Sequence, residues 1–185
     1  MSISAAEPES IRVSLREYPS GWAITVSFLE ILLLSLWLGG MIFFAFAVAP
    51  SAFAVLPTRH LAGLLVTSTL SKLELLGLIV GPLLIIAALM GTSTPRSREG
   101  RGIRILKIAQ LAIMTCAAAL SRYAITPTMV SLRNSMNDVI DNVSASDPLR
   151  IEFDRLHQYS VGLMSLAMFA GLVVLFLTVR LLKRN

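Results

Sequence analysis

Four long apolar segments divide the chain, and almost every charged residue lies between them. They cover Trp22–Val48, Leu73–Met90, Ile105–Tyr123 and Tyr159–Val179. Each segment is close to the ~20 residues that an α-helix needs to cross a bilayer. Their apolar positions are continuous, whereas a surface helix of a soluble domain has a polar face. The pattern predicts an all-α fold, a four-helix transmembrane bundle, with the lipid bilayer as its immediate partner.

The polar residues before the first span carry a weaker helical pattern. Ile11, Leu15 and Tyr18 are spaced as on one face of a short helix lying at the membrane interface. A disordered tail is the alternative interpretation. The chain is therefore divided into an N-terminal segment, residues 1–21, and a four-span membrane domain, residues 22–185.

Helical patterns also occur between the spans. The first span is expected to end at Pro50, and Thr58–Leu70 has a helical pattern that leads into the second span. Apolar residues recur at helical spacing over 129–139. Asp147 and Pro148 suit a helix N-cap followed by proline at the first helical position. The fourth span is therefore predicted to begin as a helix outside the bilayer.

The charge distribution predicts an orientation for the bundle. The formal net charge is +5, and the basic residues cluster in the 95–107 loop and at the C-terminus. Short basic segments flanking spans follow the positive-inside bias, so they do not indicate a nucleic-acid partner. We expect both termini to be cytoplasmic, in the plasma membrane or, in a bacterium, the inner membrane. Residues 50–72 and 126–157 then face outward.

Small residues at four-residue spacing predict where the spans meet, because membrane helices associate by close backbone approach. Gly77 and Gly81 form a G-x-x-x-G motif in the second span. The third and fourth spans repeat this spacing with the pairs Ala117 and Ser121, and Ala167 and Gly171. The prediction is a compact bundle with little interior room and no wide pore.

One carboxyl group, that of Glu30, is predicted to lie inside the first span. It is about two turns from the cytoplasmic side, and Gln110 in the third span is expected at a similar depth. A buried carboxyl tends to hold its proton unless it is paired. Glu30 is therefore either a proton-carrying group or cation ligand, or a structural carboxyl hydrogen-bonded to Gln110 or to a backbone carbonyl.

A second polar level is predicted near the outer ends of the spans. Glu74 shares a helix face with Gly77 and Gly81, and Arg122 lies at a similar depth in the third span. Either charge alone is costly within a bundle, so the sequence predicts a Glu74–Arg122 ion pair.

His157 lies at the mouth of the fourth span, at this same outer level. Met164 and Met168 follow it on one helical stripe, and an imidazole with thioethers is a soft ligand set that favours Cu(I). The alternative is a histidine hydrogen-bonded to Glu74 or near Arg122, with the methionines filling the core. No metal ligand set and no cofactor is assigned with these residues.

Three sequence stretches resemble a known family. Leu36–Met41 with the downstream Ala49–Phe53 resembles the first span of the transmembrane-protein-205-like family, whose function is not established. Thr126-Pro127 with Leu132-Arg133 resembles the exit of its third span. Phe153–Ser160 is similar to the beginning of its fourth span, although Gln158 stands where the family often has glycine. The resemblance implies a four-span membrane protein without an established reaction.

The Trp-Leu-Gly-Gly pattern at Trp37–Gly40 is more distantly similar to the copper-resistance D family and to small membrane protoporphyrinogen oxidases. Those families are expected to place histidines within their spans as ligands for copper or haem. The first span here has Glu30 and no histidine. The resemblance therefore does not supply the ligands of a b-type haem.

Three functions remain open from the sequence. The first is a non-enzymatic accessory or scaffold protein, in which the buried polar residues serve folding. The second is a small transporter or ion-handling protein that uses Glu30, as a homo-oligomer because one tight bundle has no room for a pathway. The third is a metal- or haem-binding oxidoreductase. No nucleophilic serine motif, H-E-x-x-H sequence or phosphate-binding glycine loop supports a hydrolase.

Overall fold

The fold is a bundle of four long helical rods. The computed structural model describes residues 21–90, 98–136 and 141–182, and all regular structure among them is helical. In chain order the elements are α1 (Gly21–Phe43), η1 (Phe44–Val48), α2 (Ala49–Val55), α3 (Arg59–Met90), α4 (Arg98–Leu120), η2 (Ser121–Ile125), α5 (Thr126–Ser135) and α6 (Pro148–Leu182). Four continuous segments, Ile24–Val55, Arg59–Met90, Gly100–Ser135 and Pro148–Leu181, are long and apolar enough to span a membrane. The predicted all-α, four-span bundle is confirmed.

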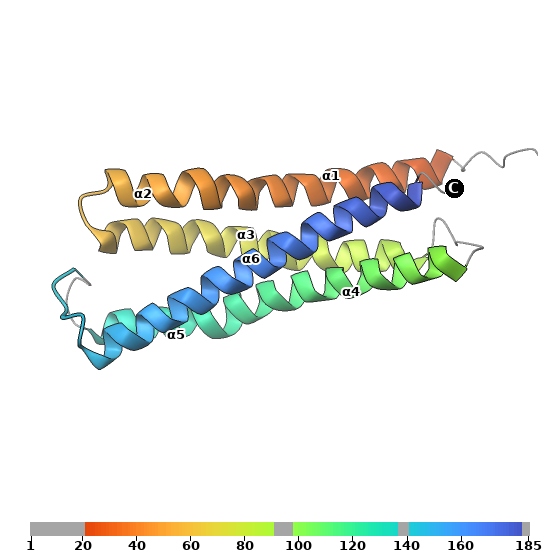
Figure 1. Ribbon diagram of the computed structural model, residues 1–185. Coiled ribbons are helices and arrows are strands. Elements are labelled where there is room, and N and C mark those ends of the chain that lie inside the picture. The colour runs from red at the N-terminus through yellow and green to blue at the C-terminus, as the bar shows by residue number, and fades with distance from the viewer. Residues whose placement is uncertain (1–20, 91–97, 137–140, 183–185) are drawn as a thin grey trace, which may run out of the picture.

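The rods form two helical hairpins. The first hairpin contains α1 to α3, and the second contains α4 to α6. The turns within the hairpins lie at one end of the bundle, at the left of Figure 1, which we call the turn end. The beginning of α1 and the end of α6 lie at the opposite end, the terminal end. The interfacial helix predicted at Ile11–Tyr18 lies outside the described residues.

The first span does not end at Pro50 as expected. Its helix passes through Pro50 to Val55 by way of η1, a π-helical turn, and η2 precedes Pro127 in the same way. Proline has no N–H and its ring clashes with the carbonyl four residues back. The preceding turn accommodates this by pairing at five residues, with the N–H of Ala49 on Phe44 O and that of Thr126 on Ser121 O.

The fourth span begins where the sequence predicted. The backbone N–H of Leu149 donates to Asp147 Oδ1 at 2.8 Å, and Pro148 is the first residue of α6. Pro148 has no N–H to leave unpaired at this position, so the Asp-Pro pair defines the helix start. The second span is one helix from Arg59 to Met90, which includes the helical segment predicted before it.

The first rods of the two hairpins share a sequence pattern that becomes recognisable once their π turns are aligned. Phe46-Ala47-Val48-Ala49-Pro50-Ser51 in the first matches Tyr123-Ala124-Ile125-Thr126-Pro127-Thr128 in the second, 77 residues later. Each stretch contains the end of a π turn and its proline. At the same interval, the buried Leu34, Trp37 and Met41 of α1 correspond to the buried Leu111, Met114 and Ala118 of α4. The first rods of the two hairpins, α1 to α2 and α4 to α5, are therefore similar in sequence pattern and burial.

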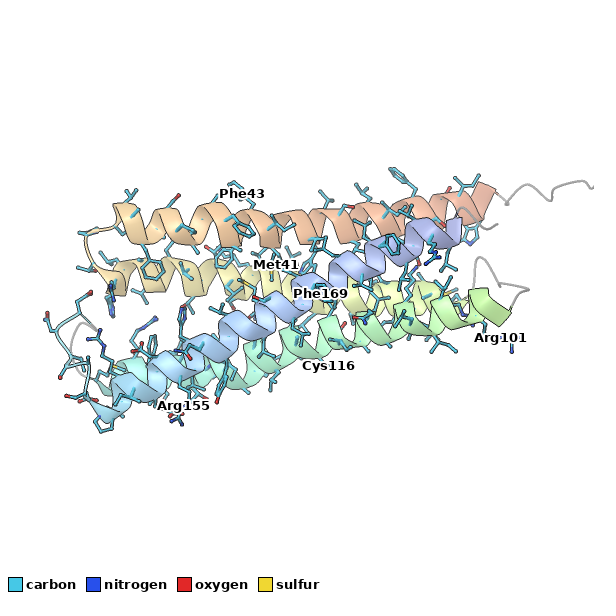
Figure 2. The ribbon with its side chains drawn as sticks, viewed as in Figure 1. Met41, Phe43, Arg101, Cys116, Arg155 and Phe169 are labelled. Carbon is cyan, nitrogen blue, oxygen red and sulfur yellow. The ribbon has the colours of Figure 1, made fainter. Side chains whose placement is uncertain are left out.

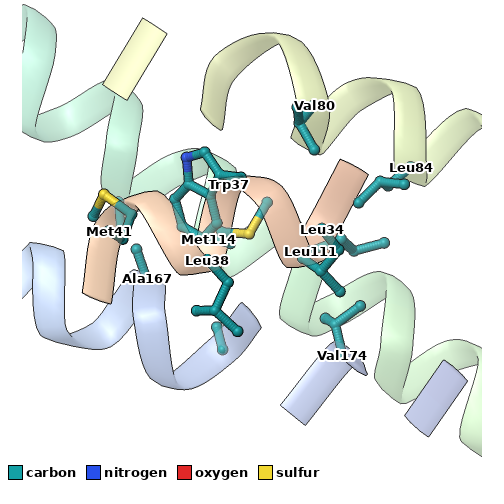
Figure 3. Close-up of a cluster of buried hydrophobic side chains, with 12 residues drawn as sticks. Leu34, Trp37, Leu38, Met41, Val80, Leu84, Leu111, Met114, Ala167 and Val174 are labelled. Atoms are coloured by element: carbon teal, nitrogen blue, oxygen red, sulfur yellow. The ribbon is translucent and has the colours of Figure 1, made fainter. Parts of the chain in front are cut away.

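Side chains of neighbouring helices pack against the small residues that were predicted to mark helix contacts. Trp37 is 3% exposed, and a Cβ on Gly77 would lie 2.9 Å from its Nε1. Gly171 of α6 approaches the same indole, and Gly81 approaches Met114 and Thr115 of α4. Figure 3 shows Trp37 and Met114 among the buried aliphatic side chains of this core. Large apolar side chains such as Phe43 and Phe169 cover the outside, where lipid would lie (Figure 2).

Candidate functional site

A buried ion pair joins the two hairpins in the half of the bundle nearer the terminal end. Lys107 Nζ of α4 donates to Glu30 Oε2 of α1 at 2.8 Å, and the two side chains are only 6% and 10% exposed. The partner of Glu30 is therefore Lys107, and the predicted hydrogen bond to Gln110 is absent. Glu30 and Lys107 are separated by the same 77 residues that relate the two halves, so the pair joins equivalent positions.

The sequence also indicates that Lys107 lies on the inward face of a helix, although it was assigned to a loop. Lys107 is the last residue of the basic 95–107 segment and was counted with the charges that set the topology. It also precedes Leu111 by four residues and Met114 by seven, and both of those are fully buried. Residues at this spacing share one helix face, so its place on the inward face of α4 was predictable once Leu111 was assigned to the core.

Glu74 and Arg122 do not form the predicted ion pair. Glu74, which is 4% exposed, accepts a hydrogen bond from Ser121 Oγ at 2.5 Å, and its Oε2 has no hydrogen-bond partner. Arg122 Nη1 instead donates to the backbone O of Ser71 at 2.7 Å and to Ser71 Oγ at 2.8 Å. The π turn η2 places Ser121 and Arg122 on adjacent levels of α3, so the serine reaches Glu74 and the arginine reaches Ser71, one turn away.

A cleft opens at the turn end between the hairpins. It consists of two adjoining cavities, an outer one of about 190 Å³ and an inner one of about 220 Å³. Both are lined by Phe53, Val66, Thr67, Met129, Arg133 and His157, which come from α2, α3, α5 and α6. The outer cavity adds polar side chains, namely Arg59, His60, Arg150 and Asp154. The inner cavity adds mostly apolar ones, including Phe44, Leu70, Val130 and Met164.

Arg133 is the most enclosed cation of this cleft, and the sequence analysis did not select it. Its guanidinium lies 5.3 Å from the centroid of the Phe153 ring, within cation–π range. Its Nη2 lies so close to Gly63 that a Cβ there would be 3.3 Å away. Its Nε is buried without a hydrogen-bond partner, and the same holds for Nδ1 of His60. Arg133 belongs to the stretch that resembles a third-span exit, but no motif joined it to the other residues of the site, which come from four different helices.

The comparison with protein families decides the assignment. The chain matches the family described as Domain of unknown function (DUF4149) over residues 32–138, which is more than half of its length. The chain belongs to the DUF4149 family. The match covers most of the first three spans, including Glu74, Lys107, Arg122 and Arg133, and ends before α6. No curated protein and no solved structure matches the chain.

In this DUF4149 protein the predicted histidine–methionine stripe of α6 is divided between two environments. His157 lines both parts of the cleft, and Met164 lines its inner cavity. Met168 does not line the cleft, and both methionines pack against the hydrophobic core. His157 makes no hydrogen bond to Glu74, whose carboxyl is held by Ser121. Within the described part of the chain, no three His, Cys, Asp or Glu side chains form a group that could hold a metal ion.

Proposed function

We propose that this membrane protein is a non-enzymatic accessory or scaffold protein whose buried ionisable residues hold its two halves together. One observation supports this most directly. The contacts Glu30–Lys107, Glu74–Ser121 and Arg122–Ser71 each join the first hairpin to the second. Polar contacts between membrane helices of this kind contribute roughly 0.5–2 kcal/mol each. The ionisable groups of the spans are therefore used for assembly.

A flux assay separates this proposal from the alternative of an ion-handling protein. The purified protein is reconstituted into vesicles, and proton and monovalent-cation flux is measured for the wild type and for Glu30→Gln. A scaffold is expected to give the flux of protein-free vesicles in both cases. Flux in the wild type that Glu30→Gln abolishes, in protein that still folds, would establish transport instead. The transport alternative has one structural observation in its favour, the unpartnered Glu74 Oε2 beside a cavity of about 10 Å³.

A bound copper ion or haem remains the third proposal to be tested, together with the resemblance to the transmembrane-protein-205-like and copper-resistance D families. We expect gently purified protein to carry neither stoichiometric copper nor iron and to show no Soret absorption. Elemental analysis and an optical spectrum measure this. Copper at one equivalent that is lost in both His157→Ala and Met164→Leu would contradict the expectation and establish the soft-ligand site.

The proposed orientation places both termini in the cytoplasm of the plasma membrane or bacterial inner membrane. It is supported by the basic residues near the terminal end. Single cysteines are introduced at the exposed Arg101 and Ala145 after Cys116→Ala removes the only native cysteine. We expect an impermeant maleimide to label Ala145→Cys in intact cells and Arg101→Cys only after permeabilisation. The reverse labelling pattern would invert the topology.

A further inference from the structure

The cleft at the turn end has a strongly cationic outer part. Among the described residues, its lining includes the three guanidinium groups of Arg59, Arg133 and Arg150 and one carboxylate, that of Asp154. A second carboxylate, that of Asp141, accepts hydrogen bonds from the backbone N–H groups of Arg59 and His60. Arg150 is already engaged with the backbone oxygen of Val143, and it contributes field rather than a vacant donor. Guanidinium groups in a partly desolvated cleft select oxyanions, because their planar donors match carboxylate and phosphate oxygens.

Arg133 supplies the donor that this selection requires. It is held from one side by the Phe153 ring and from another by the bare backbone of Gly63, and no carboxylate of the described residues forms an ion pair with it. Its position is therefore fixed by packing before any ligand arrives, which lowers the ordering cost of binding. A buried N–H without a partner is expensive, and Arg133 Nε–H is such a group in this cleft. An acceptor entering the outer cavity would satisfy this need.

The inner cavity adds a second requirement to the ligand. It continues from the outer cavity past Thr67 and His157, and its remaining walls are mainly apolar, among them Phe44, Leu70 and Met164. The π turn η1 and the proline after it place Phe44, Ala45 and Ala49 along this wall. An inorganic anion would leave the inner cavity unused, and a neutral chain would leave Arg133 unpaired. The two parts together match a molecule with one charged end and one apolar chain.

We propose that the cleft binds a single-chain anionic amphiphile, with a carboxylate or phosphate head at Arg133 and its chain between α2, α3, α5 and α6. This binding site goes beyond the scaffold role and does not depend on it. Arg133 and His157 are recognition residues in this proposal, and Thr67 lies at the junction of head and chain. Carboxylate and phosphate heads share the chemistry that Arg133 recognises, and the experiment compares the two.

Trp37 provides a built-in reporter for the chain. It shares with Leu70 and Met164 the small cavity that lies beside the inner part of the cleft. The chain has two tryptophans, and the other, Trp22, is 70% exposed. Trp22→Phe therefore leaves Trp37 as the sole emitter. The probe is ω-bromododecanoate, added to this variant in phosphatidylcholine vesicles, because bromine quenches tryptophan only at short range.

We expect saturable quenching of Trp37 that unbrominated dodecanoate or dodecyl phosphate reverses. Arg133→Gln removes a charged hydrogen-bond donor and is expected to raise the half-saturation concentration by about tenfold or more. Arg155→Gln is the matched control. Arg155 lies near His157 on α6, but its side chain is 58% exposed and it pairs with Glu152 at 3.3 Å. Arg155→Gln removes the same charge and is expected to change the half-saturation concentration little. Thr67→Phe keeps every charge, obstructs the junction and is expected to abolish the quenching.

Several results would overturn the proposal. Quenching that rises linearly without saturation would show partition into the bilayer alone. Equal weakening by Arg133→Gln and Arg155→Gln would show a general surface field. Competition by dodecanol as strong as that by dodecanoate would show that the site does not require an anionic head. Competition by inorganic phosphate at equal concentration would show that it does not require an apolar chain. Unchanged helical circular dichroism in each variant shows that the folded protein is being compared.

Discussion

Gly77→Ala is expected to destabilise the bundle by about 1–3 kcal/mol, and Gly77→Leu to prevent its assembly. The added Cβ would lie 2.9 Å from Trp37 Nε1 and 3.2 Å from its Cε2. The indole is confined on the α6 side, because Gly171 lies against its other edge. Its Nε1–H also donates to Leu73 O at 3.1 Å, which fixes the ring on α3. The measurement is the free energy of unfolding in mixed micelles of a mild detergent and dodecyl sulfate.

The matched control is Gly162→Ala, because a Cβ at Gly162 meets nothing within 4 Å. It makes the same chemical change in a span and is expected to leave stability unchanged or slightly raised. Trp37→Phe removes the atoms that clash, so Gly77→Ala is expected to cost less in that background than in the wild type. Equal losses in the two glycine variants, or strict additivity of Trp37→Phe and Gly77→Ala, would refute the proposed packing.

The architecture was predictable because it depends on properties that every residue of a span shares. Continuous apolar segments between charged ones define four spans regardless of how the spans pack. Gly77 and Gly81 were assigned to a contact face from spacing alone, and the structure places Trp37 against the first and Thr115 against the second. The start of α6 was predictable from two residues, because Asp147 and Pro148 act locally.

The partners of the buried polar groups were not predictable in the same way. Glu74 was paired with Arg122 because the two lie at similar depth, whereas Ser121 reaches Glu74 and Arg122 reaches Ser71, both from the π turn η2. The predicted Glu30–Gln110 contact had the right two helices but missed Lys107, whose charge suggested a loop. Depth along a span is readable from sequence, but rotation about the helix axis depends on local winding.

The repeat between the first rods of the two hairpins bears on one of these contacts. Glu30 and Lys107 are equivalent positions, 77 residues apart, whereas the Glu74–Ser121 and Arg122–Ser71 contacts do not join equivalent positions. Two glutamates at the equivalent positions would repel within the bundle, whereas Glu30 and Lys107 attract. This pair joins the hairpins nearer the terminal end, and the cleft lined by Arg133, His60 and His157 lies at the turn end.

Lys107→Met is expected to be among the most damaging single substitutions in the protein, with a loss of about 3–5 kcal/mol. It leaves the Glu30 carboxyl inside the bundle without its ammonium partner, so the group must remain an unpaired charge or take up a proton. Glu30→Gln keeps an oxygen that accepts from Lys107 and is expected to cost less. The double variant Glu30→Met with Lys107→Met removes both charges and is expected to lie near the wild type. The same micelle titration measures all three variants.

Exchanging the two residues tests the pair and the repeat together. If Glu30 and Lys107 occupy equivalent positions across an axis, Glu30→Lys combined with Lys107→Glu rebuilds the same contact with its direction reversed. Each single exchange places two like charges against each other and is expected to be at least as damaging as Lys107→Met, whereas the double exchange is expected to recover most of the loss. Double exchange no better than the singles would show that the positions are not equivalent. Recovery would show that folding of the bundle requires opposite charges at this level and not a carboxyl on the first span.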